Sequence, residues 1–79
     1  MEISGKQLVS FLEKLGYKKV RQKGSHIVFR KTFSYGTHNI TVPMHKVIAR
    51  GTLNNILNKI SIWNNISKKE LFLLNLKVT

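Results

Sequence analysis

The sequence predicts an α+β fold in which helices cover one face of a three-stranded antiparallel sheet. Two observations predict it. Apolar residues recur at helical spacing near both ends of the chain, whereas residues 17–42 alternate between apolar and polar side chains and are interrupted by short turn signals. The chain has 79 residues, which predicts a single domain over residues 1–79 with a small core.

The first helix is predicted over residues 5–15. Ser4 and Gln7 form a capping-box pattern at its start. The apolar residues that share one face stand at i, i+3, i+4 and i+7: Leu8, Phe11, Leu12 and Leu15. Gly16 then predicts the helix end, because glycine adopts the left-handed conformation there without a steric penalty.

Three short strands are predicted next: residues 17–22, 25–31 and 38–42. Lys23-Gly24 is predicted as the first hairpin turn, and residues 32–37 as the second connection. Pro43 ends the third strand, because proline cannot donate to the hydrogen-bond ladder. Consecutive strands joined by tight turns form an antiparallel meander.

The second strand alternates between two faces. Ile27 and Phe29 fall on one face, and His26, Val28 and Arg30 fall on the other. The apolar pair predicts the face that packs on the core. His26 is therefore expected to point away from the core, toward the surface.

Three other ring-bearing side chains have less specific patterns. His38 is the first residue of the third predicted strand, at the hairpin end next to the predicted connection, and is expected to be solvated. Tyr17 and Trp63 could stack on bases, but packing in a core or an interface is the more common use of isolated aromatic residues.

Two more helices are predicted after the sheet. Gly51-Thr52 opens the first, whose apolar stripe repeats the helical spacing: Leu53, Ile56, Leu57 and Ile60. Its asparagines are weak helix formers, so tertiary packing must hold it. Ser67 and Glu70 form a second capping-box pattern ahead of an apolar run, residues 71–74, which predicts a short C-terminal helix.

The charge balance points to an anionic partner. Fourteen Lys and Arg residues stand against three Glu, and the net charge is +11. A field of this sign attracts polyanions, of which nucleic acid is the commonest inside cells. A passive basic surface, or one that an acidic protein covers, remains the alternative.

The composition also excludes several classes of site. The chain has no Cys, so neither disulfides nor thiolate metal sites are expected. It has no Asp and three Glu, too few carboxylates for paired-carboxylate catalysis or for oxygen-ligand Mg²⁺ or Ca²⁺ sites. His26, His38 and His45 lack the spacing and the companions of a metal site, so neither a metal nor another cofactor is expected. No apolar stretch approaches a membrane span and the start has no signal-peptide pattern, which predicts a cytoplasmic protein without membrane contact.

His26 is the best candidate for chemistry. Its imidazole can take or give a proton near neutral pH. Ser25 precedes it but points to the opposite face of the strand, and no Asp could orient the ring, so a Ser-His-acid triad is poorly supported. RNA cleavage by internal transesterification needs fewer parts, since the ribose 2′-hydroxyl is the nucleophile and the protein supplies only proton transfer and cations.

Residues around His26 could bind the substrate. Arg21, Lys23 and Arg30 can stabilise phosphate charge, and the turn at Gly24-Ser25 lets the backbone approach a phosphate. His45 could act as a general acid or a phosphate ligand, or it could instead hydrogen-bond backbone where the third strand ends. An idle, solvent-exposed His26 is the alternative to a catalytic one.

Several short motifs in this order resemble the HicA family of mRNA interferase toxins, also called YcfA-like proteins. The matching pieces are Ser4-Gly5-Lys6 with Leu8 and Leu12, Leu15-Gly16-Tyr17, Arg21-Gln22-Lys23-Gly24-Ser25-His26, Val42-Pro43-Met44-His45, Gly51-Thr52-Leu53 with Ile56-Leu57, and Ile66-Ser67 with Glu70-Leu71-Phe72. The join to the last helix, residues 61–65, departs from the family pattern.

This resemblance implies a double-stranded-RNA-binding-domain-like fold and a ribonuclease that cuts mRNA without needing the ribosome. It implies that His26 is the catalytic residue. It also implies a cognate HicB-type antitoxin that covers the site. Two other functions stay open: a non-catalytic RNA-binding module of the same fold, and an interaction domain whose basic face meets an acidic protein.

Overall fold

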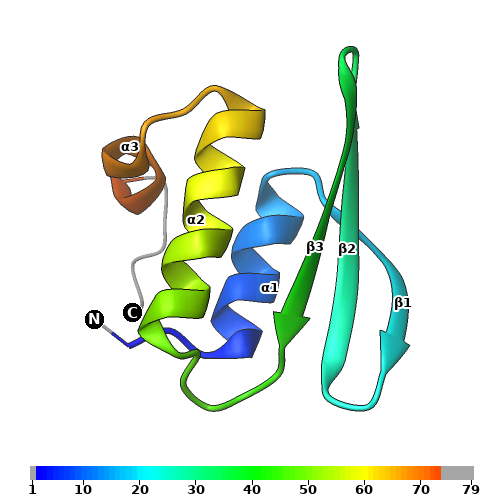
Figure 1. Ribbon diagram of the computed structural model, residues 1–79, viewed down its shortest axis with the longest axis vertical. Helices are drawn as coiled ribbons and strands as arrows, with labels where there is room; N and C mark the ends of the chain where they lie inside the picture. The colour runs from blue at the N-terminus through cyan, green and yellow to red at the C-terminus, as the bar shows by residue number, and fades with distance from the viewer. Residues whose placement is uncertain (1, 74–79) are drawn as a thin grey trace.

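The structure is a computed structural model that describes residues 2–73. Its elements are α1 (Gly5–Lys14), β1 (Lys18–Lys23), β2 (His26–Phe33), β3 (Gly36–Pro43), α2 (Arg50–Asn64) and α3 (Lys68–Leu73). The strands form one antiparallel sheet in the order β1-β2-β3. The helices lie on one side of the sheet and leave its other face open (Figure 1). The predicted α+β class and the α-β-β-β-α order with a short extra helix are confirmed.

The start of α1 is capped as predicted. The Ser4 hydroxyl accepts a hydrogen bond from the Gln7 backbone N–H at 3.1 Å, and the Gln7 side-chain oxygen accepts one from the Ser4 N–H at 2.8 Å. The helix ends at Lys14, with Leu15 as its C-cap, and Gly16 follows with a φ of +98°. The local signals therefore predicted both ends of this helix correctly.

Both hairpin turns differ from the predicted ones. Lys23 pairs with His26, so the first turn consists of Gly24 and Ser25, one residue later than the predicted Lys23-Gly24, with Gly24 at a φ of +59°. The prediction of a connection over residues 32–37 was wrong, because Thr32 pairs with Thr37 and only Ser34 and Tyr35 form the turn. Threonine and phenylalanine favour strands, and a two-residue turn lets them remain paired.

The core lies between the sheet and the helices. Every residue of the predicted apolar stripes in α1 and α2 is buried except Leu15, which is half-buried. Ile27 and Phe29 of β2 and Ile40 and Val42 of β3 face these helices. Leu71 of α3 is also buried, which confirms the short C-terminal helix as far as Leu73. Leu74, the last residue of the predicted apolar run, lies outside the described residues.

The prediction of a solvated His38 was wrong. Only 5 % of this residue is exposed. The error comes from the strand boundary: β3 begins two residues before His38, so His38 lies inside a strand rather than at a hairpin end. Side chains of a strand alternate between faces, so His38 shares the buried face with Ile40 and Val42.

Candidate functional site

His26 opens β2 at one end of the sheet. It is exposed, and its register partners are Lys23 on β1 and Pro43 on β3. Residues directly opposite one another in an antiparallel pair point to the same face. The Lys23 side chain therefore lies beside the His26 imidazole on the open face of the sheet.

Further cationic side chains lie on the open face that carries His26 and Lys23. His26, Val28 and Arg30 are i, i+2 and i+4 of β2 and point away from the helices, as predicted. Arg21 is opposite Val28, and Lys18 is opposite Arg30. The open face thus carries Lys18, Arg21, Lys23 and Arg30 together with His26.

Arg30 lies apart from His26 on this face. Four residues of strand separate them, which corresponds to about 13 Å. The Arg30 Nε atom donates a hydrogen bond of 2.8 Å to the Asn39 side-chain oxygen. A groove of about 310 Å³ lies on the open face beside it, lined by Val20, Arg21, Val28, Arg30, Asn39 and Thr41. The structure thus places Lys23 at His26 and Arg30 at the far end of a basic groove.

The loop after β3 is held against the His26 end. The Met44 N–H donates to the Ser25 carbonyl at 2.7 Å, and the Gly5 N–H donates to the His45 carbonyl at 2.9 Å. The backbone bond considered for His45 is thus made by its own carbonyl, while its side chain is exposed near Lys6 and Lys46. The β1–β2 turn, this loop and the start of α1 lie at the same end of the molecule (Figure 1).

Gly5 is the residue that allows this close approach. A Cβ atom at Gly5 would lie 2.6 Å from the Pro43 carbonyl oxygen and 2.7 Å from the Cα atom of Met44. Both are backbone atoms that cannot move aside. A side chain at this position would therefore push α1 away from the loop that carries His45.

The predicted site residues thus divide into two groups. One end of the sheet brings together Lys23, Gly24, Ser25, His26 and the backbone next to His45, all of them exposed. Arg21 lies on the same face, near this end, and Arg30 lies farther along the groove. The cations are therefore spread over a surface rather than enclosed in a pocket, which suits an extended polyanion.

His38 occupies a different environment on the other face. Its ring stacks on Trp63 with 5.2 Å between centroids and 3° between planes. The Tyr17 hydroxyl lies 2.7 Å from its Nδ1 atom. Tyr17 is buried, and Phe33 and Tyr35 pack around Trp63. The preferred interpretation of Tyr17 and Trp63, packing rather than base stacking, thus agrees with their contacts in the structure.

A hydrogen-bond chain fixes the tautomer of His38. Lys31 donates to the Asn64 side-chain oxygen at 2.6 Å, and the Asn64 amide nitrogen donates to the Ile60 carbonyl at 2.9 Å and to the Tyr17 hydroxyl at 3.0 Å. The Tyr17 proton is then left to donate to His38 Nδ1, so a neutral His38 carries its own proton on Nε2.

Burial keeps two side chains of this hydrogen-bond chain, His38 and Tyr17, uncharged. Burial lowers the pKa of His38, and the nearby charge of Lys59 lowers it further. Burial also raises the pKa of Tyr17. Both side chains are therefore neutral at pH 7. The Nε2 atom of His38 is buried and has no hydrogen-bond partner among residues 2–73.

The hydrogen-bond chain around His38 was not predicted from the sequence. The period-two pattern that joins His38 to Ile40 and Val42 could have shown that its face is buried. The contact of Lys31 with Asn64 spans 33 positions and has no local signal.

Across residues 2–73, no group of three His, Cys, Asp or Glu side chains could hold a metal ion, and no helix is long and apolar enough to cross a membrane.

Comparison with known proteins identifies the family. No curated protein and no solved structure matches the chain. A family model described as the HicA toxin of bacterial toxin–antitoxin systems matches residues 5–62. The match begins with α1, covers the whole sheet and most of α2, and includes every predicted site residue. It spans well over half of the 79 residues, and the chain therefore belongs to the HicA toxin family.

Proposed function

We propose that this toxin is a metal-independent endoribonuclease that cleaves mRNA with His26 as its catalytic proton-transfer residue, and that a HicB-type antitoxin inhibits it. The observation that carries the proposal is the exposed His26 imidazole beside Lys23 on a cationic open sheet face. Family membership supports a toxin with an antitoxin partner. The rest of the proposal depends on the chemistry of the face.

The reaction that fits these residues is internal transesterification. His26 removes the proton from a ribose 2′-hydroxyl, the 2′-oxygen bonds to the adjacent phosphorus, and the bond from phosphorus to the 5′-oxygen breaks. A protonated group returns a proton to the leaving 5′-oxygen. Because the substrate supplies its own nucleophile, the protein needs neither a serine nor a metal-bound water.

The neighbouring residues would bind the substrate. Lys23 and Arg21 neutralise the charge that develops on the phosphate, and the exposed Gly24-Ser25 turn brings backbone and hydroxyl groups to it. Arg30 would hold the RNA farther along the groove. The exposed His45 side chain stands at the same end as His26, where it would contact a neighbouring phosphate.

A non-catalytic RNA-binding module is the second candidate. The broad basic face favours it as well, because shape and phosphate contacts alone can bind RNA. An interaction domain that meets an acidic protein through the same face is the third candidate. Direct RNA binding would exclude the third candidate, and cleavage separates the first two.

The test is a cleavage assay with purified protein and RNA in excess chelator. His26→Ala is expected to lose about 10²–10⁴-fold in cleavage rate and to keep its RNA affinity within roughly a few-fold, because it removes proton transfer and no phosphate contact. Wild-type cleavage that persists in chelator supports a metal-independent reaction. An unchanged cleavage rate in His26→Ala would overturn the catalytic assignment.

A further inference from the structure

The two edges of the sheet are protected differently. Among residues 2–73, β1 and β3 each pair with β2 on one side only, so each leaves a row of backbone groups without a strand partner on the other side. Proteins usually block such edges with charged side chains and bulges. β1 has both, since four of its six residues are Lys or Arg and its register shifts between Lys19 and Arg21, at Val20.

The β3 edge has neither protection. Its eight residues include no Lys or Arg. They pair with β2 without a register shift from Gly36 to Pro43, and proline stands only at the last position. β3 is therefore a regular strand whose free edge could accept a further strand.

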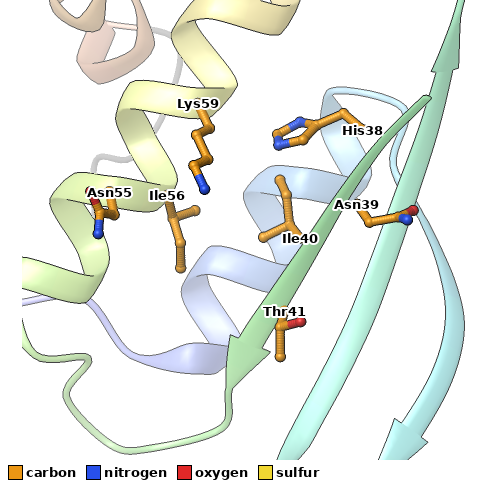
Figure 2. Close-up of a pocket in the computed structure, with 7 residues that line it drawn as sticks. All are labelled: His38, Asn39, Ile40, Thr41, Asn55, Ile56 and Lys59. Carbon is orange, nitrogen blue, oxygen red and sulfur yellow. The ribbon is translucent and has the colours of Figure 1, made fainter. Parts of the chain in front are cut away.

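A cavity of about 280 Å³ follows this edge. It is lined by residues 38–41 of β3 and by Asn55, Ile56 and Lys59 of α2. Successive side chains of a strand point to opposite faces, so a cavity that touches four consecutive residues must lie along the strand edge. Figure 2 shows His38 and Ile40 pointing toward α2 and Asn39 pointing away from it. We call this cavity the β3 edge groove.

Two hydrogen-bond donors, from His38 and Lys59, line the β3 edge groove. The Tyr17 hydrogen bond to Nδ1 leaves the His38 proton on Nε2, which is buried without an acceptor among the described residues. The His38 ring extends toward α2, where Lys59 lines the opposite wall (Figure 2). A buried N–H donor beside an ammonium group is suited to an anionic oxygen.

We propose that β3 is the docking edge for an extended acidic segment of the antitoxin, which adds to the sheet as a fourth strand and places a carboxylate between His38 Nε2 and Lys59. Backbone hydrogen bonds to β3 supply the pairing, and the carboxylate supplies the selectivity. This inference rests on the antitoxin partnership of the proposed function.

Charge favours an acidic polypeptide over the other occupants. The toxin carries a net charge of +11, so an acidic segment is complementary to it. A second copy of the chain would bring the same excess of positive charge to the edge. RNA has the charge but lacks the regularly spaced amide groups that pair with a strand edge.

The proposed docking edge also leads toward His26. The bound strand would run beside β3 from His38 to Pro43, and Pro43 is the register partner of His26. His38 in the β3 edge groove and Pro43 beside His26 thus lie at opposite ends of β3, about 17 Å apart. An antitoxin segment that pairs along β3 as far as Pro43 would have only the width of β3 to cross to reach His26 on β2.

Amide hydrogen exchange on the wild-type toxin tests the added strand directly. The probe is the protein encoded by the gene adjacent to the toxin gene. We expect alternate backbone amides of β3 to exchange more slowly in the complex, because only outward-facing amides gain a partner, while the β1 amides stay unchanged. Unchanged β3 exchange in a formed complex would overturn the proposal.

The same exchange experiment distinguishes the other occupants. Slowing of the β3 amides by RNA alone would replace the antitoxin with nucleic acid and overturn the proposal. Slowing that grows with toxin concentration, in the absence of any partner, would assign the edge to a second copy and would also overturn it.

A charge reversal tests the carboxylate. Lys59→Glu should weaken antitoxin binding by at least about tenfold, because it places like charges together in the groove. Lys69→Glu on α3 makes the same charge change on an exposed lysine outside the groove and should alter binding less than about twofold. Equal antitoxin binding by the two variants would show that Lys59 does not contact the antitoxin, and would overturn the proposed carboxylate contact.

Both charge variants should cleave RNA like the wild type, since neither residue belongs to the open face. The result of His26→Ala is independent of this experiment. Loss of cleavage in that variant together with unchanged β3 exchange would keep the ribonuclease and reject the docking edge. Protected β3 amides together with full cleavage by His26→Ala would keep the docking edge and reject His26 as the catalytic residue.

Discussion

His26 and His38 lie on the same three-stranded sheet but in opposite environments. His26 opens β2 on the open face, is exposed and is opposite Lys23. His38 lies on the helix-covered face, 5 % exposed, between Trp63 and the Tyr17 hydroxyl. The same side chain is therefore open to solvent in one place and part of a fixed hydrogen-bond chain in the other. Under the proposed function, the face of the strand, rather than the residue type, decides which histidine could transfer protons to RNA.

The first prediction concerns the support of the His26 end and has the largest expected effect on stability. Gly5→Ala should lower the free energy of unfolding by about 3 kcal/mol, because its Cβ would collide with the backbone of Pro43 and Met44. Urea denaturation measures the change.

Gly51→Ala is the matched control. Gly51 is in α2, and a Cβ there would meet nothing within 4 Å. Alanine is the better helix former, so this variant should be more stable by about 0.5–1 kcal/mol. Equal losses in both variants would show that the contact of α1 with the loop after β3 is not tight.

The second prediction concerns the His38 environment. Tyr17→Phe removes the hydroxyl that donates to His38 Nδ1 and accepts from Asn64. It should cost about 1–3 kcal/mol of unfolding free energy, because the buried His38 Nδ1 loses its donor and the Asn64 amide loses one of its two acceptors. Cleavage per folded molecule should stay unchanged. Thermal or urea unfolding and an RNA assay measure the two effects.

Tyr35→Phe is the control for this variant. The Tyr35 hydroxyl donates to the Trp63 carbonyl, but Tyr35 is 65 % exposed. Water can replace this partner, so the loss should stay below about 1 kcal/mol. A larger loss at Tyr35 than at Tyr17 would contradict the structural role of the buried chain.

The third prediction is a pH dependence of stability that comes from His38. The folded-state pKa of His38 is lowered, mainly by burial and then by Lys59, below the usual 6.5. Between these two pKa values the unfolded chain binds more protons, so the free energy of unfolding falls as the pH drops below about 6.5. Above this pH both states are neutral at His38, and its contribution is constant.

Urea denaturation between about pH 5 and pH 7.5 measures this slope. His38→Gln should flatten it, because the titrating group is gone. A slope that is the same in His38→Gln and in the wild type would contradict the assignment to His38.

The fourth prediction separates the two ends of the open face. Lys23→Ala and Arg30→Ala should each weaken RNA binding several-fold and reduce the slope of log Kd against log salt by about 1, since each removes one phosphate contact. Lys23→Ala should also lower kcat by about tenfold, because Lys23 lies beside His26. Arg30→Ala should leave kcat unchanged. Equal kcat values in the two variants would show that the transition state is not bound at Lys23.

Much of the fold could be predicted because its signals are local. The capping box at Ser4 and the apolar stripes of both main helices act within one or two turns, and they were correct. The β2–β3 turn was not predictable in the same way, because threonine and glycine occur in both strands and loops. Its true length places His38 inside β3 rather than at a hairpin end, so one boundary error led to the wrong expectation that His38 is solvated.

The candidate site shows the same division. The run of residues 21–26 predicted an exposed basic group around His26, because neighbours in a hairpin are neighbours in sequence. The anchoring of Met44 to Ser25, the hydrogen bond of Lys31 to Asn64 and the groove between β3 and α2 depend on distant segments. No local pattern reports them, because they are set by the packing of helices on the sheet.

The most direct test compares the two histidines in one assay. The initial rate of RNA cleavage in excess chelator is measured for His26→Ala and His38→Gln at equal concentrations of folded protein. We expect a loss of about 10²–10⁴-fold for His26→Ala and a rate within a few-fold of wild type for His38→Gln. Wild-type cleavage by His26→Ala, or a comparable loss in both variants, would contradict this expectation.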